Sequence, residues 1–151
     1  MTNQSDMEKD YSAEEHMALQ SGIAAFETKE FAGASKLLFP LAEAGNPEAQ
    51  YRLAIMAQNG LGQVVNEKEA ARWMQAAAEQ GFALAQHGLG FMYMEGECVK
   101  QDDAKAVHYF RLAAEQGLIG AQSTLGNLYE QGRGVEKDLA EAKRWYAKAG
   151  L

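Results

Sequence analysis

The same residue types return every 36 positions through most of this 151-residue chain, and no insertion or deletion interrupts the interval. The matched positions carry a glycine, a glutamine, a leucine and an aromatic residue: Gly45, Gly81 and Gly117; Gln50, Gln86 and Gln122; Leu53, Leu89 and Leu125; Trp73, Tyr109 and Trp145. Self-similarity at a fixed interval of roughly this length is the signature of folds that stack one supersecondary unit. The chain is therefore expected to be a repeat array.

Each copy of the repeat predicts two helices joined by a loop. In the first helix, small and apolar residues such as Ala85, Leu89 and Met92 fall on one helical face. A glycine pair, as in Gly60 and Gly62, then interrupts the pattern. Glycine readily adopts the left-handed backbone that ends a helix and turns the chain. The first helix of each copy should therefore end at this pair.

The second helix of each copy has its own start signal. Asn66, Asp102 and Asp138 are good N-cap residues, and two of them are followed three positions later by Glu69 and Glu141. That spacing predicts capping boxes, in which the glutamate side chain also reaches back to the N-cap amide. These signals support the helix boundaries independently of the repeat.

Small residues inside the first helices predict close helix crossings. Gly90 and Gly126 occupy matched positions, and Ala54 stands at the same place in the preceding copy. Glycine lowers helix propensity, but it lets two helix backbones approach closely. We expect helices to cross closely at Gly90 and Gly126.

A shortened version of the unit precedes the three copies. Ser12 to Glu15 has the spacing of a capping box. The apolar residues that follow predict one helix and then a second that ends at Gly45: Leu19, Ile23 and Phe26; Phe31, Ala34, Leu38 and Leu41. The loop between these helices is about four residues shorter than in the later copies. The chain thus predicts about four helix pairs.

These boundaries divide the chain into one repeat domain and one short leading segment. Residues 1–11 are polar and unpatterned, which predicts a disordered segment. The repeat domain, residues 12–151, then comprises the opening unit 12–45 and the units 46–81, 82–117 and 118–151.

Charge and composition exclude several classes of partner and location. The net charge is −7 and no run of lysine or arginine occurs, so nucleic acid is not an expected partner. No apolar stretch approaches the length of a membrane span, so no membrane association is expected. The polar amino terminus lacks a signal peptide, which makes the cytoplasm the default location unless a signal was removed. Cys98 is the single cysteine, so no intramolecular disulfide can form.

The two later copies resemble a known repeat family. AQHGLGFMYMEGECVKQDDAKAVHYFRLAAEQG and AQSTLGNLYEQGRGVEKDLAEAKRWYAKAG are similar to the SEL-one-like repeat (SLR), a relative of the tetratricopeptide repeat. The opening unit resembles a tetratricopeptide repeat, with Gly22, Phe31, Ala34 and Leu38 at that family's spacing. The resemblance implies an all-α fold, a right-handed α/α superhelix, and a role as an adaptor that assembles protein complexes.

The resemblance also implies where a partner would bind. First helices of such an array line its concave side. The groove positions carried over from the tetratricopeptide pattern are, in chain order, His16, Leu19, Ile23, Phe26, Tyr51, Ile55, Gln58, His87, Phe91, Met94, Ser123, Asn127 and Glu130. Most of this stripe is apolar or aromatic, and its last quarter is polar. Exposed apolar residues in a row favour an interaction site, although Leu19, Ile23 and Phe26 are equally consistent with core packing.

The carboxyl end offers a second candidate surface. The repeat ends after its second helix, and an apolar face that includes Leu139 and Trp145 would then need cover. A homodimer through this end, or a self-assembling structural module, is an alternative to an adaptor that binds an unidentified protein or peptide.

No catalytic motif was found in the sequence. The nucleophile, metal and phosphate-binding motifs are missing, and His16, His87 and His108 stand far apart. We therefore expect no enzyme activity, no cofactor and no metal. Some cysteine-rich bacterial relatives have been described as β-lactam-binding or weakly β-lactamase-active, which leaves a small hydrolase as the rival hypothesis.

Overall fold

A computed structural model describes the backbone of residues 4–151 and the side chains of residues 13–151. The described residues form helices and no strand, in the order α1 (Gln4–Glu27), α2 (Phe31–Glu43), α3 (Pro47–Asn59), α4 (Glu67–Glu79), α5 (Ala83–Glu95), α6 (Asp103–Glu115), α7 (Ile119–Gln131) and α8 (Leu139–Lys148). The prediction of an all-α superhelix of four helix pairs is confirmed.

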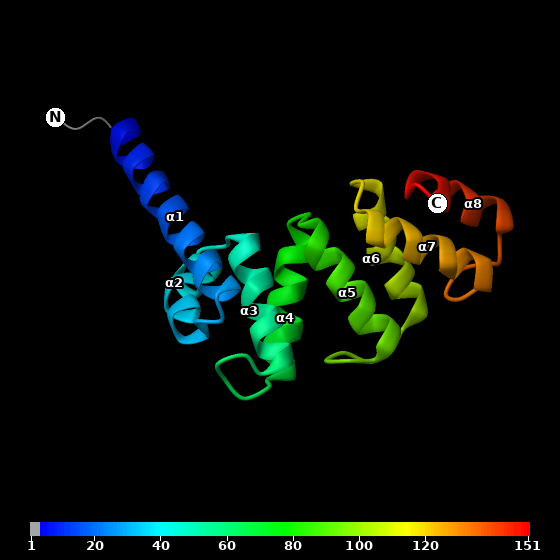
Figure 1. Cartoon of the computed structure of the whole chain (residues 1–151), viewed down its shortest axis with the longest axis horizontal. Coiled ribbons are helices and arrows are strands. Elements are labelled where there is room, and N and C mark those ends of the chain that lie inside the picture. The colour runs from blue at the N-terminus through cyan, green and yellow to red at the C-terminus, as the bar shows by residue number, and fades with distance from the viewer. Residues whose placement is uncertain (1–3) are drawn as a thin grey trace.

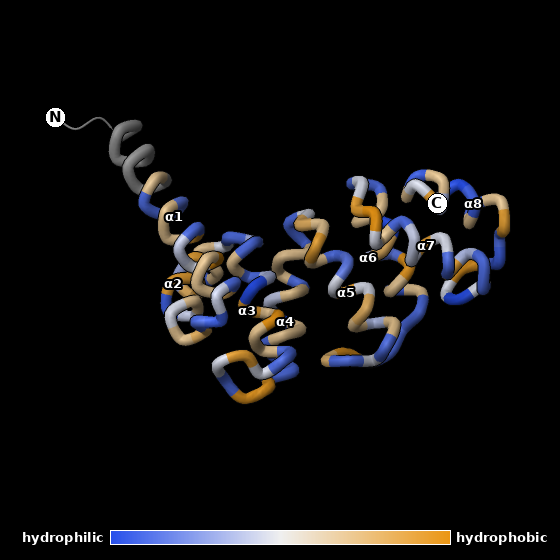
Figure 2. The backbone as a smooth tube through the Cα atoms, in the orientation of Figure 1, coloured by the Kyte–Doolittle hydropathy of each residue, from blue (hydrophilic) through white to orange (hydrophobic). Residues whose placement is uncertain are grey.

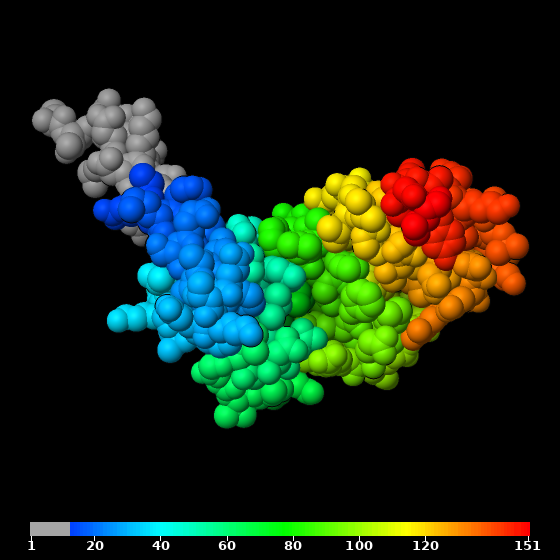
Figure 3. Space-filling model, viewed as in Figure 1, coloured from blue at the N-terminus to red at the C-terminus, as the bar shows by residue number. Residues whose placement is uncertain are grey.

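The four pairs follow one another along a single long axis (Figure 1). Contacts between elements lie almost entirely between helices that are consecutive in the chain. In the space-filling view the colours run in chain order from one end to the other, and each pair touches the pair before and after it (Figure 3). Among the described helices, none is both long enough and apolar enough to cross a membrane.

The predicted N-caps begin the second helices. Asn66 Oδ1 accepts the Glu69 amide at 3.1 Å, Asp102 Oδ1 accepts the Lys105 amide at 3.1 Å, and Asp138 caps α8 in the same way. The reciprocal half of the predicted capping boxes is wrong. The N-cap amides of Asn66 and Asp138 instead donate to carbonyls at the end of the preceding helix, and the Glu69 and Glu141 carboxylates pair with arginines one turn later. Each cap therefore also anchors the loop before it.

The predicted close crossings are confirmed. A Cβ atom added to Gly90 would lie 2.8 Å from the Phe110 ring, and one added to Gly126 would lie 2.9 Å from the Tyr146 ring. The ring from the second helix thus lies directly against the backbone of the first helix. A side chain at either glycine would force the ring or the helix to move.

Buried glutamines join neighbouring pairs. Gln50, Gln86 and Gln122 are among the few buried polar residues, and each Nε2 donates to a carbonyl at the end of the preceding second helix. The Oε1 atoms of Gln50 and Gln86 also accept from Gln80 and Gln116, at 2.9 and 2.7 Å. We call this arrangement the glutamine relay. It satisfies buried polar groups at the joint between pairs.

The opening unit packs as the sequence predicts from residue 13 onward. Ala34, Leu38 and Leu41 are buried, and Phe31 packs against the same core. The backbone of α1 begins at Gln4, so the helix runs through Ser12 and does not start there. Of the predicted disordered segment, residues 1–11, the backbone of residues 4–11 belongs to the helix α1, and residues 1–3 lie outside the described residues.

Candidate protein-binding groove

The amino-terminal quarter of the predicted groove is divided between core and surface. Leu19 is buried in the core, so the packing alternative holds for this residue. Ile23 and Phe26 are half-buried, and the Phe26 ring packs edge-on against Phe31 at 5.8 Å. His16 is exposed. This part of the stripe contributes more to packing than to an open surface.

The next quarter, on α3, is half-buried. The Tyr51 ring lies 5.4 Å from the Phe82 ring, and burial raises the pKa of the Tyr51 phenol. Ile55 and Gln58 are also half-buried. The Tyr51 ring is therefore already packed on one side against the start of the next pair.

A cluster of three rings forms the centre of the groove. The rings of His87, Phe91 and Phe110 lie 4.9 to 5.6 Å apart in edge-to-face arrangements. Phe110 comes from α6 and is fully buried, whereas Phe91 is 39% exposed. Such arrangements are favourable for aromatic pairs. Phe110 thus supports an aromatic surface that Phe91 presents to solvent.

His87 is held in a neutral environment within this cluster. Its Nε2 atom is buried and has no hydrogen-bond partner among the described residues. Burial lowers the pKa of the His87 imidazole from its ordinary value of 6.5. Burial therefore favours the neutral form of the ring over the protonated form.

The last quarter of the groove contains a cavity of about 480 Å³. It lies between the end of α5, the helix α7, the loop that follows α7, and α8. Its lining residues are Met94, Ser123, Thr124, Asn127, Leu128, Gln131, Arg133 and Tyr146. We call this cavity the α7 pocket. Three predicted groove residues, Met94, Ser123 and Asn127, come together in it.

The polar groups of the α7 pocket are held in place by contacts within the chain. Tyr146 Oη donates to Glu130 Oε2 at 2.7 Å, and this hydrogen bond raises the pKa of the Tyr146 phenol. Arg133 donates to Asp103 at 3.0 Å and to the Met94 carbonyl at 2.9 Å. The guanidinium is therefore largely neutralised, and the pocket combines uncharged polar groups with apolar walls.

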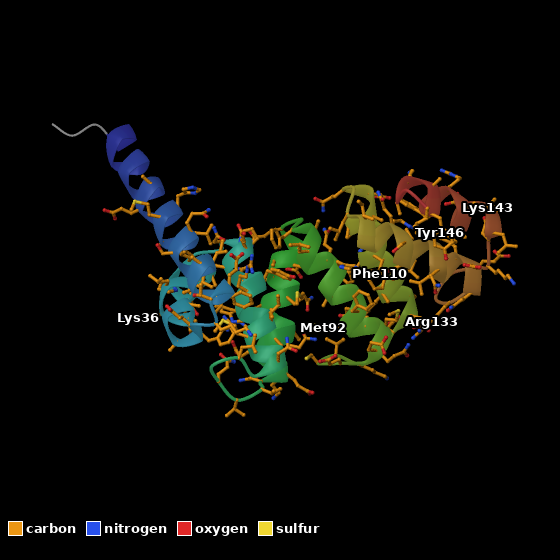
Figure 4. All side chains as sticks on the ribbon, in the orientation of Figure 1. Lys36, Met92, Phe110, Arg133, Lys143 and Tyr146 are labelled. Carbon is orange, nitrogen blue, oxygen red and sulfur yellow. The ribbon has the colours of Figure 1, made fainter. Side chains whose placement is uncertain are left out.

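Tyr146 and Arg133 are site residues that the sequence reasoning missed (Figure 4). The groove positions are predicted from the first helices alone, which leaves out Tyr146 on α8. Its matched residues are Met74 and Phe110, both buried. The available signal was Gly126, because the close crossing that it permits carries the Tyr146 ring against α7.

The carboxyl end differs from the prediction in one residue. Leu139 is exposed, as expected, but Trp145 is buried in the core with Lys148 over its ring at 4.4 Å. Trp145 is buried, as the matched Trp73 is, so it cannot form part of an exposed apolar end face.

Chemistry beyond binding finds little support among residues 13–151. Within that range, no group of three His, Cys, Asp or Glu side chains could hold a metal ion. Burial and the neighbouring carboxylates of Glu67 and Glu97 raise the pKa of the Cys98 thiol, which disfavours a reactive thiolate.

Comparison with known proteins identifies the repeat. A family model described as the Sel1 repeat matches residues 47–82, 83–118 and 120–151. No curated protein matches the chain with significance.

Solved structures are similar over most of the chain. A Sel1 repeat protein from Oxalobacter formigenes is 35% identical over 87% of this chain, with a TM-score of 0.84. A protective antigen present in uropathogenic Escherichia coli strains, displaying an SLR fold, is 37% identical over 95% of this chain, with a TM-score of 0.86. This chain spans 54% and 32% of the lengths of those two proteins.

A third solved structure is similar in fold alone. Helicobacter pylori cysteine rich protein B is 23% identical, with a TM-score of 0.58, over 91% of this chain and 86% of its own.

Proposed function

Because the chain belongs to the Sel1 repeat family, whose members commonly serve as protein-interaction scaffolds, we propose that it is a non-enzymatic adaptor that binds a segment of a partner protein along its concave groove. The binding region would run from the aromatic cluster at Phe91 to the α7 pocket. The observation that carries this proposal is the continuity of the two: Met94 lies one helical turn beyond Phe91 on α5 and lines the pocket.

The two parts of the surface favour different partner groups. The exposed face of Phe91 offers an apolar contact supported from below by the buried Phe110 ring. The α7 pocket offers amide and hydroxyl groups from Asn127, Ser123 and Thr124. Apolar anchoring together with a few fixed polar groups is typical of peptide recognition. A segment with an apolar side chain at one end and exposed backbone or polar groups at the other would match this surface.

Binding measurements on groove variants test the proposal. Partners captured by the purified chain would be identified by mass spectrometry, and their affinities measured by calorimetry. Phe91→Ala combined with Met94→Ala should weaken binding at least tenfold, because aromatic and methionine side chains dominate interface centres. Asn127→Ala should weaken it by a smaller factor.

Leu139→Ala provides the matched control, since Leu139 is exposed and apolar but does not line the pocket. It should leave the affinity unchanged. Equal affinities for the double groove variant and the wild type, with both folded by circular dichroism, would move the binding site elsewhere. Nitrocefin turnover that disappears on unfolding would instead favour the hydrolase alternative.

A further inference from the structure

The loop between α3 and α4 is apolar where the matching loops are polar or charged. Val64 and Val65 are 87% and 52% exposed. At the same two positions, the α5–α6 loop has Lys100 and Gln101, and the α7–α8 loop has Glu136 and Lys137. Figure 2 shows orange, hydrophobic segments in the α3–α4 loop where it projects from the array. A solvent-exposed valine pair at this point is not required by the repeat fold.

A cavity of about 350 Å³ opens beside this loop. Its walls come from α2, α3, the loop and α4, and we call it the loop cleft. Phe39, Leu53, Ala57, Val64 and Trp73 supply its apolar surface, and Gln63, Asn66 and Glu69 supply its polar rim. The rings of Phe39 and Trp73 meet edge-on at 6.2 Å. The loop cleft lies outside the predicted groove, because none of the groove residues lines it.

The next pair shows what normally occupies this space. The corresponding cavity beside the α5–α6 loop is smaller, about 290 Å³, and the residue that matches Ala57 is Tyr93. The Tyr93 ring stacks in parallel on Tyr109, the match of Trp73, with centroids 5.8 Å apart. In the last pair the same position is Tyr129. Two pairs therefore fill the space with a ring of their own, and the pair of α3 and α4 leaves it open with an alanine.

The chemistry of the missing ring follows from its surroundings. The Tyr129 hydroxyl oxygen accepts a hydrogen bond from the Arg111 guanidinium on the preceding second helix. Beside the loop cleft, the position that matches Arg111 is Phe39, on the second helix that precedes α3. Its side chain is 47% exposed and cannot hydrogen-bond to a hydroxyl. A ring without a hydroxyl is thus the better match for the apolar Phe39 side chain at this place.

We propose that the loop cleft is a docking site for a phenylalanine side chain of a protein partner, which takes the place that Tyr93 and Tyr129 fill in the other pairs. The ring lies against Trp73, Phe39 forms the side wall, and Val64 and Val65 contact the residues that flank the ring in the partner. This surface lies apart from the groove, so the array holds its partners at two places.

Nuclear magnetic resonance titration with N-acetyl-phenylalaninamide tests the site. The Trp73 indole N–H and the methyl groups of Ala57 and Val64 should shift, whereas Phe91 and Tyr146 should not. N-acetyl-tyrosinamide should bind several-fold more weakly. Ala57→Tyr, which restores the residue of the other pairs, should abolish the shifts at Trp73.

Two further variants keep the test decisive if Ala57→Tyr fails to fold. Val64→Lys with Val65→Gln gives the loop the residues of the next pair at exposed positions, and it should weaken binding at least several-fold. Tyr93→Ala opens the matching cleft and should create a second responsive site at Tyr109.

Three outcomes would overturn the proposal. Shifts at Trp73 that persist in both loop-cleft variants would place the probe elsewhere. Equal affinity for the tyrosine and phenylalanine probes would remove the stated preference. Concentration-dependent shifts at Trp73 without any probe, lost in Ala57→Tyr, would show that a second copy of this chain occupies the cleft. Failure of the groove variants above would leave these readouts unaffected, because they report on different residues.

Discussion

The pair of α5 and α6 and the pair of α7 and α8 use the same crossing for different purposes. In both, a ring from the second helix lies against a glycine of the first: Phe110 against Gly90 and Tyr146 against Gly126. Phe110 is fully buried beneath His87 and Phe91. Tyr146 is partly exposed, bonds to Glu130 and lines the α7 pocket.

The difference arises from what lies beyond each pair. The helix α7 packs on α6, the second helix of the pair of α5 and α6, and no described helix packs on α8 from beyond its pair. In a stacked array each unit is buried by its neighbours, so a matched position can be core in one pair and surface in another. The residue at this position is phenylalanine in the pair of α5 and α6 and tyrosine in the pair of α7 and α8.

Truncating the two rings should give the largest difference in the free energy of unfolding between the two pairs. Phe110→Ala should lower the free energy of unfolding by about 3 to 5 kcal/mol, because it leaves a cavity in a fully packed site. Tyr146→Ala should cost about 1 kcal/mol, since the ring is only partly buried. Urea denaturation followed by circular dichroism measures both. Equal losses would mean that Tyr146 is as much a core residue as Phe110.

Adding a methyl group beneath each ring should give a smaller contrast. Gly90→Ala should destabilise the chain by about 1 to 3 kcal/mol, because the Phe110 ring is enclosed and cannot move away. Gly126→Ala should cost less, because the partly exposed Tyr146 ring can swing outward, which leaves only the contact of the added Cβ with the Ala142 carbonyl oxygen at 3.2 Å. Thermal melting of the two variants tests the order, and a larger loss for Gly126→Ala would contradict it.

The loops of the two pairs differ by one strained residue. Cys98 has a left-handed φ of 66°, whereas the matched Gly134 has a φ of 71°. Cys98→Gly should therefore stabilise the chain by about 1 kcal/mol, which is the usual penalty for a side chain in this conformation. The converse change, Gly134→Cys, should destabilise it, since an added Cβ would lie 2.4 Å from the Asp103 carbonyl oxygen. A Cys98→Gly variant with a lower melting temperature would show that the thiol packing outweighs the strain.

The smallest difference in stability between the two pairs should appear at acid pH. It arises because α5 has His87 where α7 has Ser123. Burial lowers the folded-state pKa of His87, so the unfolded chain binds a proton at higher pH than the folded chain. The stabilising contribution of the neutral ring is complete above pH 6.5 and is lost as the pH falls through the lowered pKa. His87→Phe should reduce the fall in melting temperature between about pH 7.5 and about pH 5. An identical fall in both proteins would assign the acid response to other groups.

The sequence predicted the repeated parts of the molecule better than the parts that vary. The helix pairs, the N-caps at Asn66 and Asp102 and the crossings at Gly90 and Gly126 follow from local chemistry that every copy shares. The sequence alone could not show that Tyr146 reaches the groove, because its exposure depends on what packs beyond its pair.

The loop cleft illustrates the same limit. Because the 36-residue repeat aligns Ala57 with Tyr93 and Tyr129, the sequence shows that alanine stands where the other two copies have tyrosine. The structural effect of this difference depends on where the side chain at that position lies. The stacked rings of Tyr93 and Tyr109 show that location. Departures from an internal repeat become interpretable once an intact copy shows what each position contacts.

The glutamine relay has a consequence for how the length of such an array can change. Each joint is encoded by one glutamine per copy, and Gln50 and Gln86 make the same two contacts. Recombination between their codons would remove 36 residues, and Gln50 would then accept from Gln116 as Gln86 does. Copy number can therefore rise or fall by whole units with every joint preserved. Loss of residues 51–86 would remove the loop cleft with its unit, whereas gain of a unit between the loop cleft and the α7 pocket would move these two surfaces apart by a fixed step.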